Sequence, residues 1–87
     1  MNVPNLDALG TTPGPLRLYA MKLSRRLRRM SGTREAIIGG VYNLLIHYAR
    51  TKAGAMEDRL QGNIPSAMHL EGLCDRIYQQ LPEKARW

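Results

Sequence analysis

Apolar residues recur at helical spacing in three segments of the chain. The first segment starts at Pro15, a residue suited to the first turn of a helix, and ends near Met30. Its apolar positions repeat at intervals of four and three residues: Leu16, Ala20, Leu23, Leu27 and Met30. Because successive helical residues are about 100° apart, these positions share one face, and the basic residues of the segment lie outside it. The pattern predicts an amphipathic helix with a basic outer face.

The second segment is apolar around more than half of a helix, which predicts a central, buried helix that starts near Thr33. Gly39 and Gly40 each cost about 1 kcal/mol relative to alanine in a helix interior, so we expect another backbone to approach closely there. We also expect Gly54 to break or bend this helix, although Met56 and Leu60 would fit a helix that continues. Two neighbouring stripes make up the apolar surface: Ile37, Val41, Leu44 and Tyr48 in one, and Ile38, Tyr42, Leu45 and Ala49 in the other.

The third segment follows a turn at residues 62–65 and predicts a helix that starts near Pro65 and ends before Pro82. Its apolar stripe consists of Ala67, Leu70, Cys74, Ile77 and Leu81. Residues 1–14, by contrast, have no helical period and contain two prolines and two glycines, so we expect a disordered N-terminal arm. We therefore predict an all-α fold, in which a small three- or four-helix bundle forms a single domain over residues 15–87 after that flexible arm.

The length of the chain limits the size of this core. With 87 residues the protein has room for one domain, and a domain of this size buries only about 60% of the surface that its unfolded chain exposes. Its hydrophobic content of 44% is ordinary for a globular protein, but Phe is absent. The seams on the first and third helices would also suit self-association, so we keep a homodimer open as an alternative.

The excess positive charge of the protein is concentrated near one end. The chain has a net charge of +6, from 13 Lys and Arg residues against 7 Asp and Glu residues. Residues 1–34 contain seven of the basic residues and one of the acidic residues, whereas residues 35–87 contain six of each kind. The whole excess therefore lies in the first 34 residues, which indicates a polyanionic partner.

The strongest candidate site is the run Arg-Arg-Leu-Arg-Arg at residues 25–29. The planar guanidinium group presents a fork of donors that matches phosphate oxygens, and several arginines on one helix face would neutralise several phosphates. We therefore predict a non-catalytic nucleic-acid-associated binding protein or small regulator that contacts the phosphates of DNA or RNA. The predicted contact residues are Arg17, Lys22, Arg25, Arg26, Arg28, Arg29 and Arg34.

Protein binding is the alternative interpretation. The basic face would also suit an acidic protein surface, and the chain would then be an adaptor or inhibitor that docks on a larger nucleic-acid-handling complex. Apolar residues outside the predicted core would supply its contacts: Leu18, Met21, Met56, Met68 and Trp87. A membrane-surface helix is a third interpretation, but residues 15–30 lack Trp and Phe, so we do not expect a membrane partner.

Catalysis and cofactor binding have little support in the sequence. The single cysteine, Cys74, lies in an apolar stripe and is best explained as a small buried residue. His47 and His69 lie on different predicted helices, without the spacing of a metal site. We expect no enzyme activity, cofactor, metal or small-molecule substrate. Residues 1–15 carry no secretory signal, and the longest apolar stretch is shorter than the roughly 20 residues of a membrane span, so we expect a soluble, cytoplasmic protein.

Overall fold

The computed structural model describes residues 3–9, 12–29 and 33–87, and the side chains of all of these except residues 33–38. Within these ranges the chain forms three α-helices and no strand: α1 (Gly14–Arg28), α2 (Thr33–Leu60) and α3 (Ile64–Gln80). Two short 3-10 helices, η1 (Leu6–Ala8) and η2 (Glu83–Ala85), lie near the ends of the chain. The predicted all-α fold is thus confirmed, with three helices that match the three apolar patterns.

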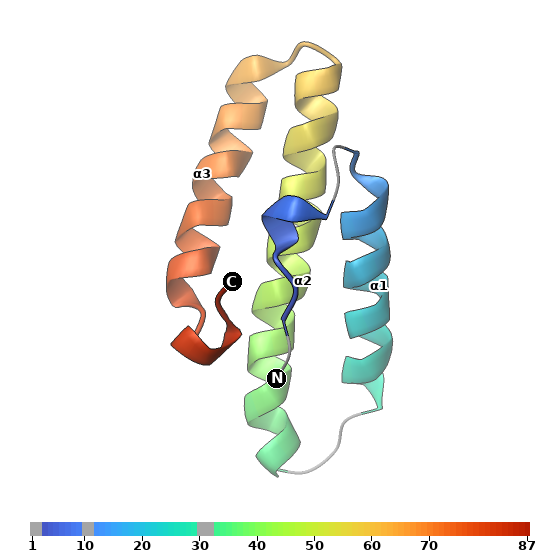
Figure 1. The fold of residues 1–87 in the computed structure, drawn as a ribbon, viewed down its shortest axis with the longest axis vertical. Coiled ribbons are helices and arrows are strands. Elements are labelled where there is room, and N and C mark those ends of the chain that lie inside the picture. Colours follow the sequence, from blue (N-terminus) through green and yellow to red (C-terminus); the bar gives the residue numbers. More distant parts are fainter. Residues whose placement is uncertain (1–2, 10–11, 30–32) are drawn as a thin grey trace.

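Helix α2 is the centre of the arrangement. It lies between α1 and α3, which run antiparallel to it and contact it extensively (Figure 1). Its 28 residues span about 42 Å, close to the 44 Å length of the whole molecule. The central helix was predicted correctly, because a helix that is apolar around most of its circumference needs neighbours on more than one side.

The core forms where the predicted apolar stripes of the three helices meet. Helix α1 contributes Leu16, Ala20 and Leu23, which are all buried. Helix α2 contributes residues from both of its stripes, with Tyr48 from one and Leu45 and Ala49 from the other. The α3 residues Ala67, Cys74 and Ile77 are also buried, together with Leu81 directly after the helix. Three residues of the predicted stripes, Met30, Ile37 and Ile38, lie outside the described side chains.

Helix α2 continues through Gly54, so the predicted break or bend at this residue is wrong. Its neighbours Ala53 and Ala55 are fully buried, and a Cβ at position 54 would lie 3.4 Å from Cδ1 of Leu70 on α3. Tertiary packing therefore outweighs the helix penalty of about 1 kcal/mol for glycine. The helix ends instead at Leu60, and Gly62, with a φ of 80°, closes a Schellman-type cap behind it.

The two helical glycines Gly39 and Gly40 have different surroundings. A Cβ at position 39 would lie 3.1 Å from Cδ1 of Leu27 on α1, whereas a Cβ at position 40 would meet nothing within 4 Å. The predicted close approach at this pair is therefore made at Gly39 only. It is made by the Leu27 side chain of α1 and not by a backbone.

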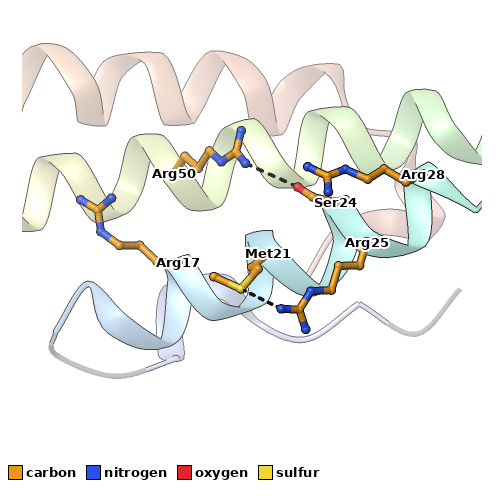
Figure 2. Close-up of a pocket in the computed structure, with 6 residues that line it drawn as sticks. All are labelled: Arg17, Met21, Ser24, Arg25, Arg28 and Arg50. Atoms are coloured by element: carbon orange, nitrogen blue, oxygen red, sulfur yellow. Dashed lines mark hydrogen bonds between the residues drawn. The ribbon is translucent and has the colours of Figure 1, made fainter.

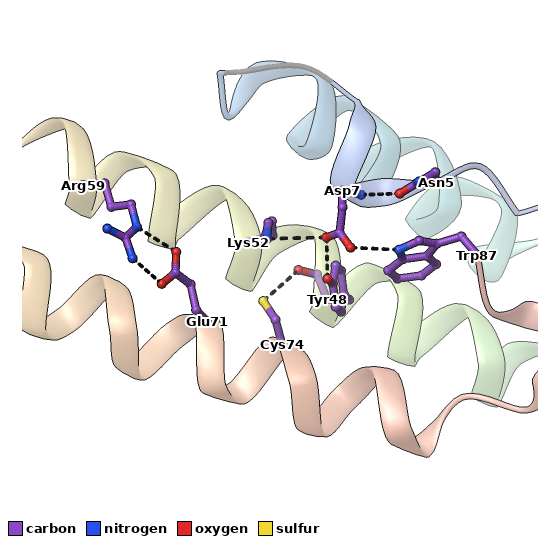
Figure 3. Close-up of polar contacts among 8 residues, drawn as sticks. All are labelled: Asn5, Asp7, Tyr48, Lys52, Arg59, Glu71, Cys74 and Trp87. Carbon is purple, nitrogen blue, oxygen red and sulfur yellow. Dashed lines mark hydrogen bonds and ion pairs between the residues drawn. The ribbon is translucent and has the colours of Figure 1, made fainter.

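Both ends of the chain pack against α2. Leu6 is fully buried in the core, and the Asn5 side chain accepts a hydrogen bond of 3.0 Å from the backbone N–H of Asp7. The Asp7 carboxylate is in turn bound by side chains of α2 and by Trp87 at the other end of the chain (Figure 3). Residues 3–9 thus contact α2 and the core through one buried leucine and one carboxylate, although the segment has no helical period.

Candidate nucleic-acid interface

The predicted contact residues of α1 lie on its exposed surface but on two different flanks. Arg34 lies outside the described side chains, and the other six are all exposed: Arg17, Lys22, Arg25, Arg26, Arg28 and Arg29. At about 100° per residue, Arg17, Arg25 and Arg28 point toward one flank, and Lys22, Arg26 and Arg29 toward the other. The first flank faces a groove. The six described residues are therefore divided between two flanks and do not form one site.

The groove lies between α1 and α2 and has a volume of about 530 Å³. Its lining, drawn in Figure 2, consists of Arg17, Met21, Ser24, Arg25 and Arg28 of α1 and Arg50 of α2. The α2 arginine was not predicted as a contact residue. Its sequence neighbourhood carries no arginine run, and only the pairing of the two helices places its side chain beside Ser24.

Arg28 and Arg50 approach Ser24 from opposite directions (Figure 2). Arg50 Nη2 donates a hydrogen bond of 3.4 Å to Ser24 Oγ, and Ser24 Oγ donates one of 2.9 Å to the Ala20 carbonyl oxygen. Arg25 Nη2 lies 3.6 Å from Met21 Sδ, a weak acceptor. None of these contacts neutralises a guanidinium charge, and each arginine keeps further donors for a ligand.

Ion pairing divides the groove arginines into two kinds. The described side chains form three ion pairs, Arg17–Glu57 at 2.6 Å, Lys52–Asp7 at 3.4 Å and Arg59–Glu71 at 2.6 Å. The charge of Arg17 is therefore balanced at one end of the groove. Arg25, Arg28 and Arg50 contact no carboxylate among the described side chains, so no acidic group in that part of the chain balances the charge of these three arginines.

Comparison with known proteins identifies no relative of this chain. No family model, no curated protein and no solved structure matches the chain. The groove must therefore be interpreted from its own side chains.

All five aromatic side chains are described, and none of them lines the groove. Tyr48 and Tyr78 pack edge-to-face against Trp87, with ring centroids 4.7 and 4.8 Å apart. Tyr19 and Tyr42 are half-buried, and burial, followed by the proximity of Tyr42, raises the pKa of Tyr19. The groove therefore offers no aromatic ring for base stacking, and its guanidinium groups have the geometry to donate to phosphate oxygens.

The apolar residues of the alternative, protein-binding interpretation also have different surroundings. Leu18, Met21 and Met68 are exposed large hydrophobic residues, whereas Met56 is half-buried. Trp87 packs on two tyrosines and donates to Asp7, so it is part of the folded structure rather than a free contact residue.

The residues with catalytic or metal-binding chemistry lie apart from the groove. Cys74 is buried, as predicted, and burial raises the pKa of its thiol to about 11. His47 and His69 are exposed on α2 and α3. In the described ranges no three His, Cys, Asp or Glu side chains gather as a metal ion would require. Over the same ranges, no helix combines the length and the apolar character needed to cross a bilayer.

Proposed function

We propose that this protein is a non-catalytic nucleic-acid-binding protein that contacts phosphates through the arginine-rich face of α1. The observation that supports this proposal is the excess of exposed basic side chains on α1 whose charge no described carboxylate balances, with Arg17 as the exception. The net charge of +6 comes from this part of the sequence, since residues 35–87 contain equal numbers of acidic and basic residues.

Like charges at this density repel one another, and a polyanion removes that repulsion when it binds. Arginine offers two parallel donors to a phosphate, and counterions released from the nucleic acid provide much of the binding free energy. Without exposed aromatic residues in the groove, binding depends on the backbone of the nucleic acid and only weakly on its bases. This is the behaviour of a protein that binds with little sequence preference.

The direct test replaces four arginines, Arg25, Arg26, Arg28 and Arg29, with alanine. We expect the variant to keep its helical circular dichroism, because alanine is a strong helix former and these side chains are exposed. Its affinity for labelled duplex DNA, single-stranded DNA or RNA should fall by about 100-fold at 50 mM salt. A folded variant that binds as tightly as the unchanged protein would show that these arginines do not contact phosphates.

Docking on another protein is the second candidate function, and a specific surface favours it. Leu60, Ile64 and Met68 are exposed by 74%, 41% and 61%, and they lie at the turn between α2 and α3. Ile64 and Met68 are four residues apart, so they share a face of α3. A partner bound there would lose affinity on Met68→Ser and change little between 50 and 200 mM salt, which separates this function from phosphate binding.

A further inference from the structure

We infer that phosphate binding is centred on the groove between α1 and α2, where Arg25, Arg28 and Arg50 hold the nucleic-acid backbone. This inference rests on the proposed function and makes it more specific in two ways. It adds Arg50, a residue of a second helix, to the site. It also predicts that the opposite flank of α1, with Lys22, Arg26 and Arg29, contributes less to the affinity for nucleic acid.

Convergence of charge is the first argument. A phosphate in the groove is approached by arginines from two helices, whereas the basic residues of the opposite flank, Lys22, Arg26 and Arg29, all come from one short segment of the chain. Coulomb attraction falls with distance, so three guanidinium groups around one concave site attract an anion more strongly than three spread along a convex helix. A phosphate between Arg28 and Arg50 would also relieve the repulsion between their charges.

The second argument is the fixed position of Arg50. Its neighbours in the sequence, Ala49 and Thr51, are buried, so the backbone at this point of α2 is held by the core. The side chain is further positioned by its hydrogen bond to Ser24 on α1. Less conformational freedom is then lost when a phosphate binds. Arg17 at the end of the groove is excluded, because Glu57 already occupies its guanidinium.

The test compares two triple variants that remove the same charge. One replaces the groove residues Arg25, Arg28 and Arg50 with glutamine, and the other replaces Lys22, Arg26 and Arg29 with glutamine. The groove variant should lose about 100-fold in affinity for labelled duplex DNA at 50 mM salt. The slope of log affinity against log salt concentration (the salt slope) should become smaller in magnitude by about 3. The flank variant should lose less than about 10-fold, through net charge alone. Equal losses would overturn the inference while leaving the proposed function standing.

Arg50 can also be tested alone. Arg50→Gln should lower the salt slope of the full chain by about 1. Arg76→Gln on α3 is the matched control, because Arg76 is exposed and forms no ion pair with a described side chain. We expect the control to bind as the unchanged protein does. If the two single variants bind alike, Arg50 is not a contact residue.

An experiment without nucleic acid separates this inference from the proposed function. Tripolyphosphate is titrated into the full chain, and the arginine Nε–Hε signals are followed by NMR. Shifts of Arg28 and Arg50 larger than those of Arg26 and Arg29 would support the groove even if no nucleic acid binds. Equal shifts, or none, would contradict the groove even if nucleic acid binds. Circular dichroism of every variant confirms that each one folds.

Discussion

The indole Nε1 of Trp87 donates a hydrogen bond of 3.0 Å to Oδ2 of Asp7, across 80 positions of the sequence (Figure 3). The other carboxylate oxygen accepts a hydrogen bond of 2.6 Å from the Tyr48 hydroxyl and lies 3.4 Å from Lys52 Nζ. One carboxylate thus joins the N-terminal segment, the central helix and the C-terminal residue. Helix α2, which carries Arg50, is held at Tyr48 and Lys52 by contacts that no local pattern in the sequence would predict.

Replacement of Asp7 by alanine should destabilise the fold. Hydrogen bonds to a charged group contribute about 1.5–3 kcal/mol each, but the Asp7 side chain is 47% exposed, so we expect a total loss of about 1–2 kcal/mol. Urea unfolding followed by the fluorescence of Trp87 measures the loss. Asp75→Ala on α3 is the control, because Asp75 is exposed and contacts no basic side chain among those described. Equal stability of the two variants would rule out the anchoring role of Asp7.

The contribution of Asp7 should also depend on pH. Burial alone opposes ionisation, but the hydrogen bonds from Tyr48 and Trp87 and the charge of Lys52 together hold the pKa of Asp7 below its ordinary value of 3.8. A lowered pKa in the folded state stabilises the fold above the unfolded pKa, and this stabilisation is lost as the pH falls through the folded pKa. The stability difference between the natural chain and Asp7→Asn should therefore be constant down to about pH 5 and shrink below pH 3.8. A difference that is the same at pH 7 and pH 2 would contradict this assignment.

Two glycine substitutions should change stability in opposite directions. Gly40→Ala adds a Cβ in an exposed part of α2 with nothing within 4 Å, so it should raise the free energy of unfolding by about 1 kcal/mol. Gly62→Ala places a Cβ on a residue with a φ of 80°, so it should lower the same quantity by about 1 kcal/mol. Thermal unfolding of the two variants in one buffer provides the comparison. Shifts of the same sign would contradict the cap at Gly62.

The helices could be predicted from the sequence because their apolar spacing is local. The contacts of Leu6 and Trp87 could not, since their partners lie far away in the sequence. Gly54 misled the prediction because a local penalty was weighed without the packing of Leu70 against it. The arginine run identified the basic flank of the groove, but the run says nothing of α2. Arg50 joins the site only through the pairing of α1 with α2.

A carboxylate placed in the groove should raise the stability of the fold and lower its affinity for DNA. Ser24→Glu puts a negative charge four residues before Arg28 on the same helix and beside Arg50. It should raise the free energy of unfolding by about 0.5 kcal/mol, because a Glu–Arg pair at this spacing stabilises a helix. The same carboxylate should lower the affinity for labelled duplex DNA at least tenfold, because it occupies the donors and repels phosphate. Ser24→Gln is the neutral control, and a glutamate variant that is stable and still binds would exclude the groove as the site.

The central claim is that the groove arginines Arg25, Arg28 and Arg50 neutralise phosphates, and the salt dependence of binding tests it most directly. Fluorescence anisotropy of a labelled DNA duplex would be measured against the unchanged protein at 50 and 200 mM salt. Each neutralised phosphate adds about −0.9 to the slope of log affinity against log salt, so three phosphates predict a loss of about 40-fold over this range. A loss of this size or greater is the predicted result. Binding that is absent at 50 mM salt, or equally tight at both salt concentrations, would contradict the account.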